Sequence, residues 1–192
     1  MNYGINKFTI SLPEWVAEFV EETGTRFATV DNRMGFVIEL ARRNIRYGTG
    51  GPFGAAVFEE NGELIAPGVN IVVPASCSIL HAEMVAFAIA QQRCGSFDLS
   101  CGGTQIRELA TSTEPCAMCF GAVPWSGVRR LTCGARDEDA RGAGFDEGPK
   151  LPNWVEELEK RGIQVCRDVL RDEAVAVLQE YASSGAPIYN PG

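Results

Sequence analysis

Hydrophobic residues recur at helical spacing in the first quarter of the chain and then change to the pattern of paired strands. The helical spacing is that of Met34, Val37, Ile38, Leu40, Ala41 and Ile45. It predicts a helix over residues 30–47, which the Gly- and Pro-containing run at 48–52 ends. Apolar stretches at 53–60 and 63–73 flank Asn61-Gly62, a dipeptide typical of a β-hairpin turn.

The rest of the pattern alternates between helices and strands. Residues 79–93 are apolar almost all round, which predicts a buried helix with Ser78 as its N-cap. Further helices are expected near 117–125, 153–160 and 170–182, strands near 104–111, 128–134 and 162–166, and a loop rich in Gly, Asp and Glu at 135–149. A hairpin followed by alternating strands and helices predicts a layered α/β domain with a mixed sheet.

Composition narrows the class of protein. A chain of 192 residues suits one domain, with residues 1–27 as an extension packed on it. The composition, with 45% apolar and 22% charged residues, is that of an ordinary soluble protein. With no apolar run long enough for a bilayer and no secretory signal pattern, a cytoplasmic location is expected. The formal net charge of −8 gives little support for nucleic-acid binding and favours a small, weakly charged substrate.

Two short motifs contain candidate chemistry. The only histidine lies in His81-Ala82-Glu83, and two of the seven cysteines lie in Pro115-Cys116-Ala117-Met118-Cys119. Separately, a lone histidine on an apolar helix is more often a core residue, and a C-x-x-C pair is a redox pair or half of a structural zinc site. The structural zinc site lacks a fourth ligand, and the redox pair leaves the histidine and the glutamate without a role.

Together the two motifs suit a catalytic zinc site. Cys116 and Cys119 share one face of a helical turn, Pro115 is placed where a helix can begin, and a helix N-terminus lowers thiol pKa values. His81, expected in the first turn of the buried helix, is the third ligand, so the fourth position is left for a water. Glu83 is then placed to take the proton of that water and return it to the ring nitrogen and the leaving amine. The arrangement H-x-E…P-C-x-x-C is the signature of zinc nucleobase deaminases.

At residues 30–149 the chain resembles the cytidine-deaminase-like superfamily and, within it, the bacterial guanine deaminases. Further segments that carry the resemblance are Gly51-Pro52-Phe53-Gly54-Ala55, Gly68-Val69-Asn70, Glu114-Pro115-Cys116, Trp125 and Gly144-Phe145-Asp146-Glu147. The resemblance implies a three-layer α/β/α sandwich with a five-stranded mixed sheet, and a homodimer.

The resemblance also implies roles for individual residues. Asn70 would bind the base through its amide, Phe53 and Trp125 would stack on a flat ring, and Glu147 would be a second proton-handling or amine-recognising group. Each has a simpler alternative: a strand-end amide, core aromatics and a solvated loop carboxylate. The N-terminal extension and the ending that contains Tyr189 depart from compact members, and Tyr189 is either a closure of a pocket or surface packing.

These features predict zinc-dependent hydrolysis of guanine to xanthine and ammonia. The alternatives within enzymes are deamination of ammeline, cytosine or a nucleoside, and tRNA adenosine deamination, which the acidic balance disfavours. The alternative outside enzymes is an inactive zinc-binding scaffold. Loss of the shuttle carboxylate would mark such a scaffold, and Glu83 is present.

Overall fold

A five-stranded mixed sheet forms the centre of the molecule. The computed structural model describes residues 8–190. The strands are β1 (Gly54–Glu59), β2 (Leu64–Val69), β3 (Arg107–Thr113), β4 (Arg130–Ala135) and β5 (Gln164–Cys166). Their order in the sheet is β2-β1-β3-β4-β5; β1 is antiparallel to both of its neighbours, and β3, β4 and β5 are parallel. The predicted hairpin and mixed sheet are confirmed, with strands somewhat shorter than expected.

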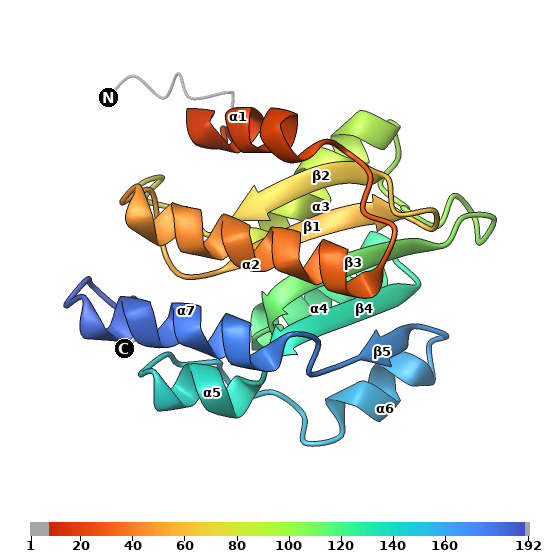
Figure 1. The fold of residues 1–192 in the computed structure, drawn as a ribbon. Helices are drawn as coiled ribbons and strands as arrows, with labels where there is room; N and C mark the ends of the chain where they lie inside the picture. The colour runs from red at the N-terminus through yellow and green to blue at the C-terminus, as the bar shows by residue number, and fades with distance from the viewer. Residues whose placement is uncertain (1–7, 191–192) are drawn as a thin grey trace, which may run out of the picture.

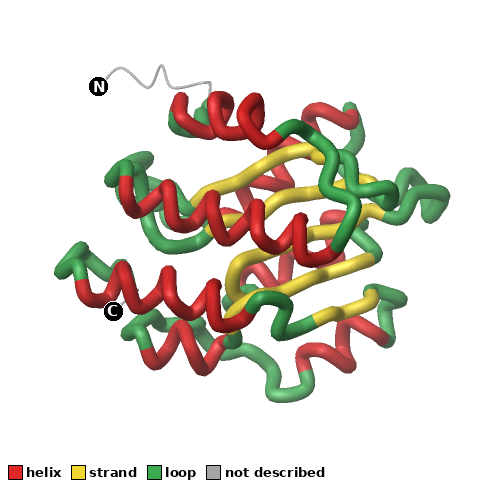
Figure 2. The backbone as a smooth tube through the Cα atoms, in the orientation of Figure 1, coloured by secondary structure: helices red, strands yellow, loops and turns green. Residues whose placement is uncertain are grey.

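Helices cover both faces of this sheet. They are α1 (Glu14–Thr23), α2 (Val30–Arg46), α3 (Ala82–Cys94), α4 (Ala117–Ser126), α5 (Asp137–Gly142), α6 (Trp154–Glu159) and α7 (Arg171–Ser183). In Figure 1, α2 and α7 lie in front of the sheet and α3 and α4 lie behind it. Figure 2 shows the strands between two layers of helices, so the predicted three-layer sandwich is confirmed. None of the helices within residues 8–190 has the length and apolar character needed to cross a bilayer.

The side chains of β1 alternate between the two halves of the core. Ala56 and Phe58 join the cluster under α2 and α7, whereas Ala55 and Val57 join the cluster under α3 and α4. Successive side chains of a strand point to opposite faces, so a strand covered on both faces must be apolar at every position. The unbroken apolar run of β1 is the sequence signature of its central place.

The first helix packs against the domain. Trp15, Val16 and Phe19 of α1 are buried, and the ring of Phe19 stacks on Phe36 of α2 with centroids 5.1 Å apart. The expected extension at 1–27 therefore includes a packed helix, and its first seven residues lie outside the described part of the chain.

The start of α3 differs from the prediction, which was wrong about the N-cap. The N-cap is His81, not Ser78, and the helix begins at Ala82. Residues 71–80 form turns instead, in which Cys77 N donates to Val72 O and Ile71 N donates to Leu80 O. An apolar run without polar punctuation does not reveal such a turn, because Leu80 is buried in it as it would be in a helix.

The predicted loop at 135–149 was also wrong in part, because it contains the short helix α5. Its acidic residues are concentrated in the first turn, where carboxylates interact favourably with free backbone N–H groups. Asp139 accepts a hydrogen bond from the backbone N of Arg136 at 2.7 Å and so caps the helix. The composition indicated a loop, whereas the positions of the acids favour a helix start.

Candidate active site

Two helix N-termini meet at one edge of the sheet. Because β1 is antiparallel to both β2 and β3, these two strands run in the same direction and end at the same edge. The chain leaves β2 towards α3 and leaves β3 towards α4. Ligand sites of α/β proteins form where such carboxyl ends of strands open. The topology therefore brings the two sequence motifs together.

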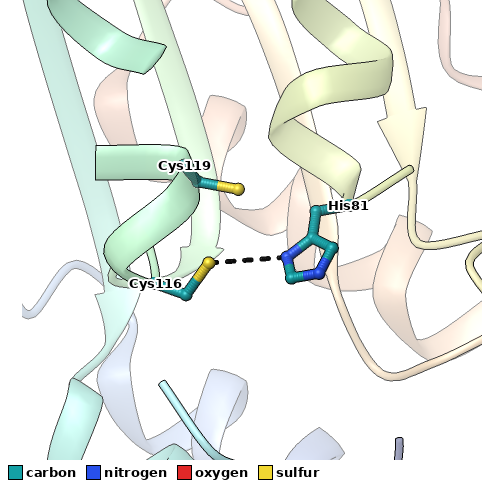
Figure 3. A group of neighbouring side chains, drawn as sticks. All are labelled: His81, Cys116 and Cys119. Carbon is teal, nitrogen blue, oxygen red and sulfur yellow. Dashed lines mark hydrogen bonds between the residues drawn. The ribbon is translucent and has the colours of Figure 1, made fainter. Parts of the chain in front are cut away.

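His81, Cys116 and Cys119 converge at this edge. His81 is the N-cap of α3, Cys116 is the N-cap of α4, and Cys119 lies in the first turn of α4. The imidazole Nδ1 is 3.5 Å from the Cys116 sulfur, and the three ligand atoms all lie within 4.8 Å of one another (Figure 3). His81 is thus one position earlier than expected, and Pro115 precedes the N-cap instead of opening the helix. Neither N-cap side chain makes the usual capping hydrogen bond to its own helix, and the two side chains face each other instead.

The environment of the cluster favours one thiolate. A hydrogen bond from the Cys119 thiol, with a further one from His81, lowers the pKa of Cys116 to about 4 against the effect of burial. The N-terminus of α4 acts in the same direction, since its exposed N–H groups stabilise negative charge. The hydrogen bond to Cys116 and burial together raise the pKa of Cys119.

Two buried carboxyl groups lie beside the cluster. Glu83, in the first turn of α3, is 6% exposed, and burial followed by the charge of Cys116 raises its pKa to about 7. Glu147 is 5% exposed, and burial with the charges of Cys116 and Glu83 raises its pKa to about 8. Carboxyl groups with a pKa near neutrality can both accept and donate a proton at physiological pH. Burial of Glu147 argues against the alternative that it is a solvated loop residue.

A cavity of about 660 Å³ connects these groups to the remaining candidate residues. Its lining includes His81, Glu83, Cys116, Glu147, Asn70 and Phe53. The ring of Phe53 contacts Phe145 edge-on, with centroids 4.9 Å apart, so it is held as one wall of the cavity. Cavities of this size hold small organic ligands.

The backbone around Asn70 is held by a buried residue that the sequence analysis missed. The Asn44 amide donates to Gly51 O and to Asn70 O, both at 2.8 Å, and its own carbonyl accepts from Thr49. Asn70 Oδ1 accepts from Val72 N at 3.3 Å. The available signal was an asparagine on the apolar face of α2, where a polar group needs a buried partner.

The structure does not bring Trp125 to the cavity. It lies at the end of α4 and is 86% exposed, so it neither lines the cavity nor packs in the core of this chain. Tyr189, by contrast, is among the cavity-lining residues. The C-terminal segment is held near Glu147, because Asn190 Oδ1 accepts from Asp146 N at 2.9 Å.

Comparisons with known proteins agree with this geometry. The family model of the cytidine and deoxycytidylate deaminase zinc-binding region matches residues 29–135. The guanine deaminase of Bacillus subtilis is 37% identical over 111 residues, which are 57% of this chain and 67% of that protein. A solved structure of guanine deaminase from Nitrosomonas europaea is 49% identical, with a TM-score of 0.86 over 92% of this chain and 97% of that one. A variant of the protein NE0047 in complex with 8-azaguanine is also 49% identical, with a TM-score of 0.87 over 93% and 98% of the two chains.

Proposed function

Because the chain belongs to the cytidine and deoxycytidylate deaminase family of zinc-binding enzymes, we propose that it hydrolyses guanine to xanthine and ammonia. The observation that carries this proposal is that one cavity is lined by His81 and Cys116 of the His/Cys/Cys cluster, two buried carboxyl groups and an amide. The bacterial relatives named guanine deaminase and the neighbour with bound 8-azaguanine favour a purine over the other bases of the family.

The donor set fits zinc. One imidazole nitrogen and two sulfurs within 4.8 Å of one another are ligands that zinc prefers, and three protein ligands are typical of catalytic zinc sites. His81, Cys116 and Cys119 would hold the ion. When bound, zinc supplies a Lewis acid that makes water a nucleophile at neutral pH.

The two carboxyl groups act on the protons and on the departing amine of the reaction. Glu83 accepts one proton of the attacking water and delivers it to the ring nitrogen. It then passes the second proton, from the hydroxyl group formed on C2, to the amine, so that the C2–N bond breaks, ammonia leaves and a carbonyl group remains at C2. Its pKa of about 7 suits both directions of transfer. Glu147 lines the same cavity and holds the departing amine; burial, with the charges of Cys116 and Glu83, raises its pKa to about 8.

Asn70 and Phe53 orient the base. The side-chain oxygen Oδ1 of Asn70 accepts a hydrogen bond from Val72 N, and within residues 8–190 the side-chain nitrogen of Asn70 donates to no protein group. That nitrogen is free to bind an acceptor of the base in the cavity. Phe53 provides a flat apolar wall for the ring. Precise orientation is needed because displacement of the reacting carbon by about 1 Å can cost about 10²-fold in rate.

The functional unit is a homodimer in this proposal. In α4, Trp125 is 86% exposed, and Met118, at the rim of the cavity, is 37% exposed. Exposed large apolar groups on one helix are typical of a contact surface. Light scattering at micromolar concentration should give twice the chain mass of 20.8 kDa, and a monomer mass would refute the dimer.

A substrate panel tests the function. Zinc-loaded protein is assayed for ammonia release from guanine, adenine, cytosine, cytidine, ammeline and tRNA, with the Glu83→Gln variant as the matched control. Guanine should be the preferred substrate. If tRNA, ammeline or a pyrimidine were preferred, that compound would replace guanine as the assigned substrate. If no compound released ammonia, an inactive zinc-binding scaffold would be favoured.

A further inference from the structure

Lys150 is a nearly buried cation that contacts the backbone next to Cys116. Its side chain is 6% exposed, and its Nζ donates to Pro115 O at 3.0 Å. The same nitrogen is 2.9 Å from Asp137 Oδ1 and 3.6 Å from Glu114 Oε2. It also lies 4.9 Å from the centroid of the Trp154 ring. Lysine is rarely buried to this degree unless it is paired, so this position is closely specified.

Lys150 belongs to the same short segment as Glu147 and binds the residue that precedes Cys116. A second contact joins the two segments, because Ala117 N donates to Glu147 O at 2.9 Å. The two hydrogen bonds thus lie on either side of Cys116 in one segment, and at Glu147 and Lys150 in the other. They fix the spacing of the two backbones.

The segments also pack closely between these two hydrogen bonds. A Cβ added at Gly148 would lie 3.0 Å from the Ala117 Cβ, so the two segments would have to move apart by a few tenths of an ångström to accept it. Arg141 holds the outer side of the segment, since its guanidinium donates to Gly148 O at 2.8 Å and to Asp137 at 2.6 Å. Asp137 therefore connects the two cations that hold residues 147–150.

We infer that Lys150 is a positioning residue, which fixes the carboxyl group of Glu147 relative to Cys116 by holding Pro115. The inference rests on the proposed function, in which Glu147 acts on the departing amine. A long carboxylate side chain keeps its place in a cavity only if its backbone is held. Without the Lys150 contact, residues 147–150 keep one hydrogen bond to the 115–117 segment and Glu147 loses its fixed position.

A double-mutant cycle separates positioning from a purely structural role. Lys150→Met keeps most of the side-chain stem and removes the donor. It should lower kcat for guanine about 10- to 100-fold. KM, the affinity for 8-azaguanine and the zinc content should change much less. In a Glu147→Gln background the same substitution should change kcat by no more than about twofold, because the group that Lys150 positions is already absent. Lys160→Met, at the 66% exposed C-cap lysine of α6, is the matched control and should resemble wild type.

Three results would overturn the inference: unchanged kcat in Lys150→Met, an equal loss of kcat in both backgrounds, or loss of zinc. If Lys150→Met does not fold, as circular dichroism would reveal, Arg141→Met replaces it in the same cycle with the same criteria. Arg141 is 44% exposed, so its removal is better tolerated. A wild-type protein that binds zinc and 8-azaguanine but releases no ammonia from guanine contradicts the proposed function instead. The cycle is then run with the compound of the panel that is turned over.

Discussion

Gly68 of β2 packs closely against the first turns of α3, the helix that follows His81 and carries Glu83. A Cβ added there would overlap the carbonyl oxygen of Ala82 and lie 2.7 Å from the backbone N of Ala86. Both groups belong to the first turns of α3, and backbone cannot move aside as a side-chain end can. Gly68→Ala therefore forces the start of α3 away from the sheet by roughly 1 Å, the difference from an ordinary carbon contact.

This displacement sets the expected magnitudes. Overpacking of this kind costs about 1–3 kcal/mol in the free energy of unfolding. For a chain of this length the melting temperature falls by about 2–4 °C per kcal/mol. Because Glu83 moves with the helix, turnover should fall by up to about 10²-fold. Thermal melting and ammonia release measure the two effects separately.

Gly35→Ala is the matched control. Gly35 lies inside α2, where an added Cβ would meet Leu170 at 3.9 Å, an ordinary contact. Alanine is favoured over glycine in a helix interior by about 0.5–1 kcal/mol, so this variant should melt slightly higher and keep full activity. If Gly68→Ala instead had the same melting temperature as Gly35→Ala and turned over guanine at the wild-type rate, the close approach at Gly68 would not position α3.

Four further predictions concern single groups. Glu83→Gln should keep about one zinc per chain but lose at least about 10²-fold in kcat; wild-type turnover would exclude it as the proton carrier. Asn70→Ala should raise KM and lower kcat for guanine, and unchanged kinetics would show that Asn70 does not bind the base. Cys119→Ala should hold no zinc by metal analysis and release no ammonia, whereas full activity without metal would contradict the zinc site. Hydrogen bonds from Arg171 lower the pKa of Asp139. The stabilisation of the fold by the ionised Asp139 is therefore present above about pH 4 and is lost as the pH falls through the lowered pKa. Asp139→Asn should flatten the dependence of the melting temperature on pH between about pH 5 and 3, and an unchanged slope would refute the assignment.

Local sequence patterns were sufficient to predict a helix or strand wherever one hydrophobic periodicity dominated. The helix α2, the Asn61-Gly62 hairpin and the strand-helix alternation were predictable because burial requires a period of 3.6 in helices and apolar positions on both faces of a central strand. Chemistry was predictable for a similar reason. The spacing of His81 with Glu83 and of Cys116 with Cys119 constrains each pair to one turn, so their ligand character is visible without the fold.

The sequence pattern by itself thus determined the element types, the layered α/β class with a mixed sheet and the residue types of the candidate site, and the family resemblance added the three-layer arrangement. Only the tertiary structure decided how these parts meet: that β2 and β3 end at one edge, and that His81 is an N-cap. It also placed Trp125 in solvent and brought Lys150 beside Pro115. These are long-range relations between segments, and a pair such as Lys150 and Pro115 has no periodic signal because its contact depends on the packing of the whole domain. Asn44 belongs to the same class, since a buried amide is recognised as a support of Asn70 only once its partners from distant loops are in place.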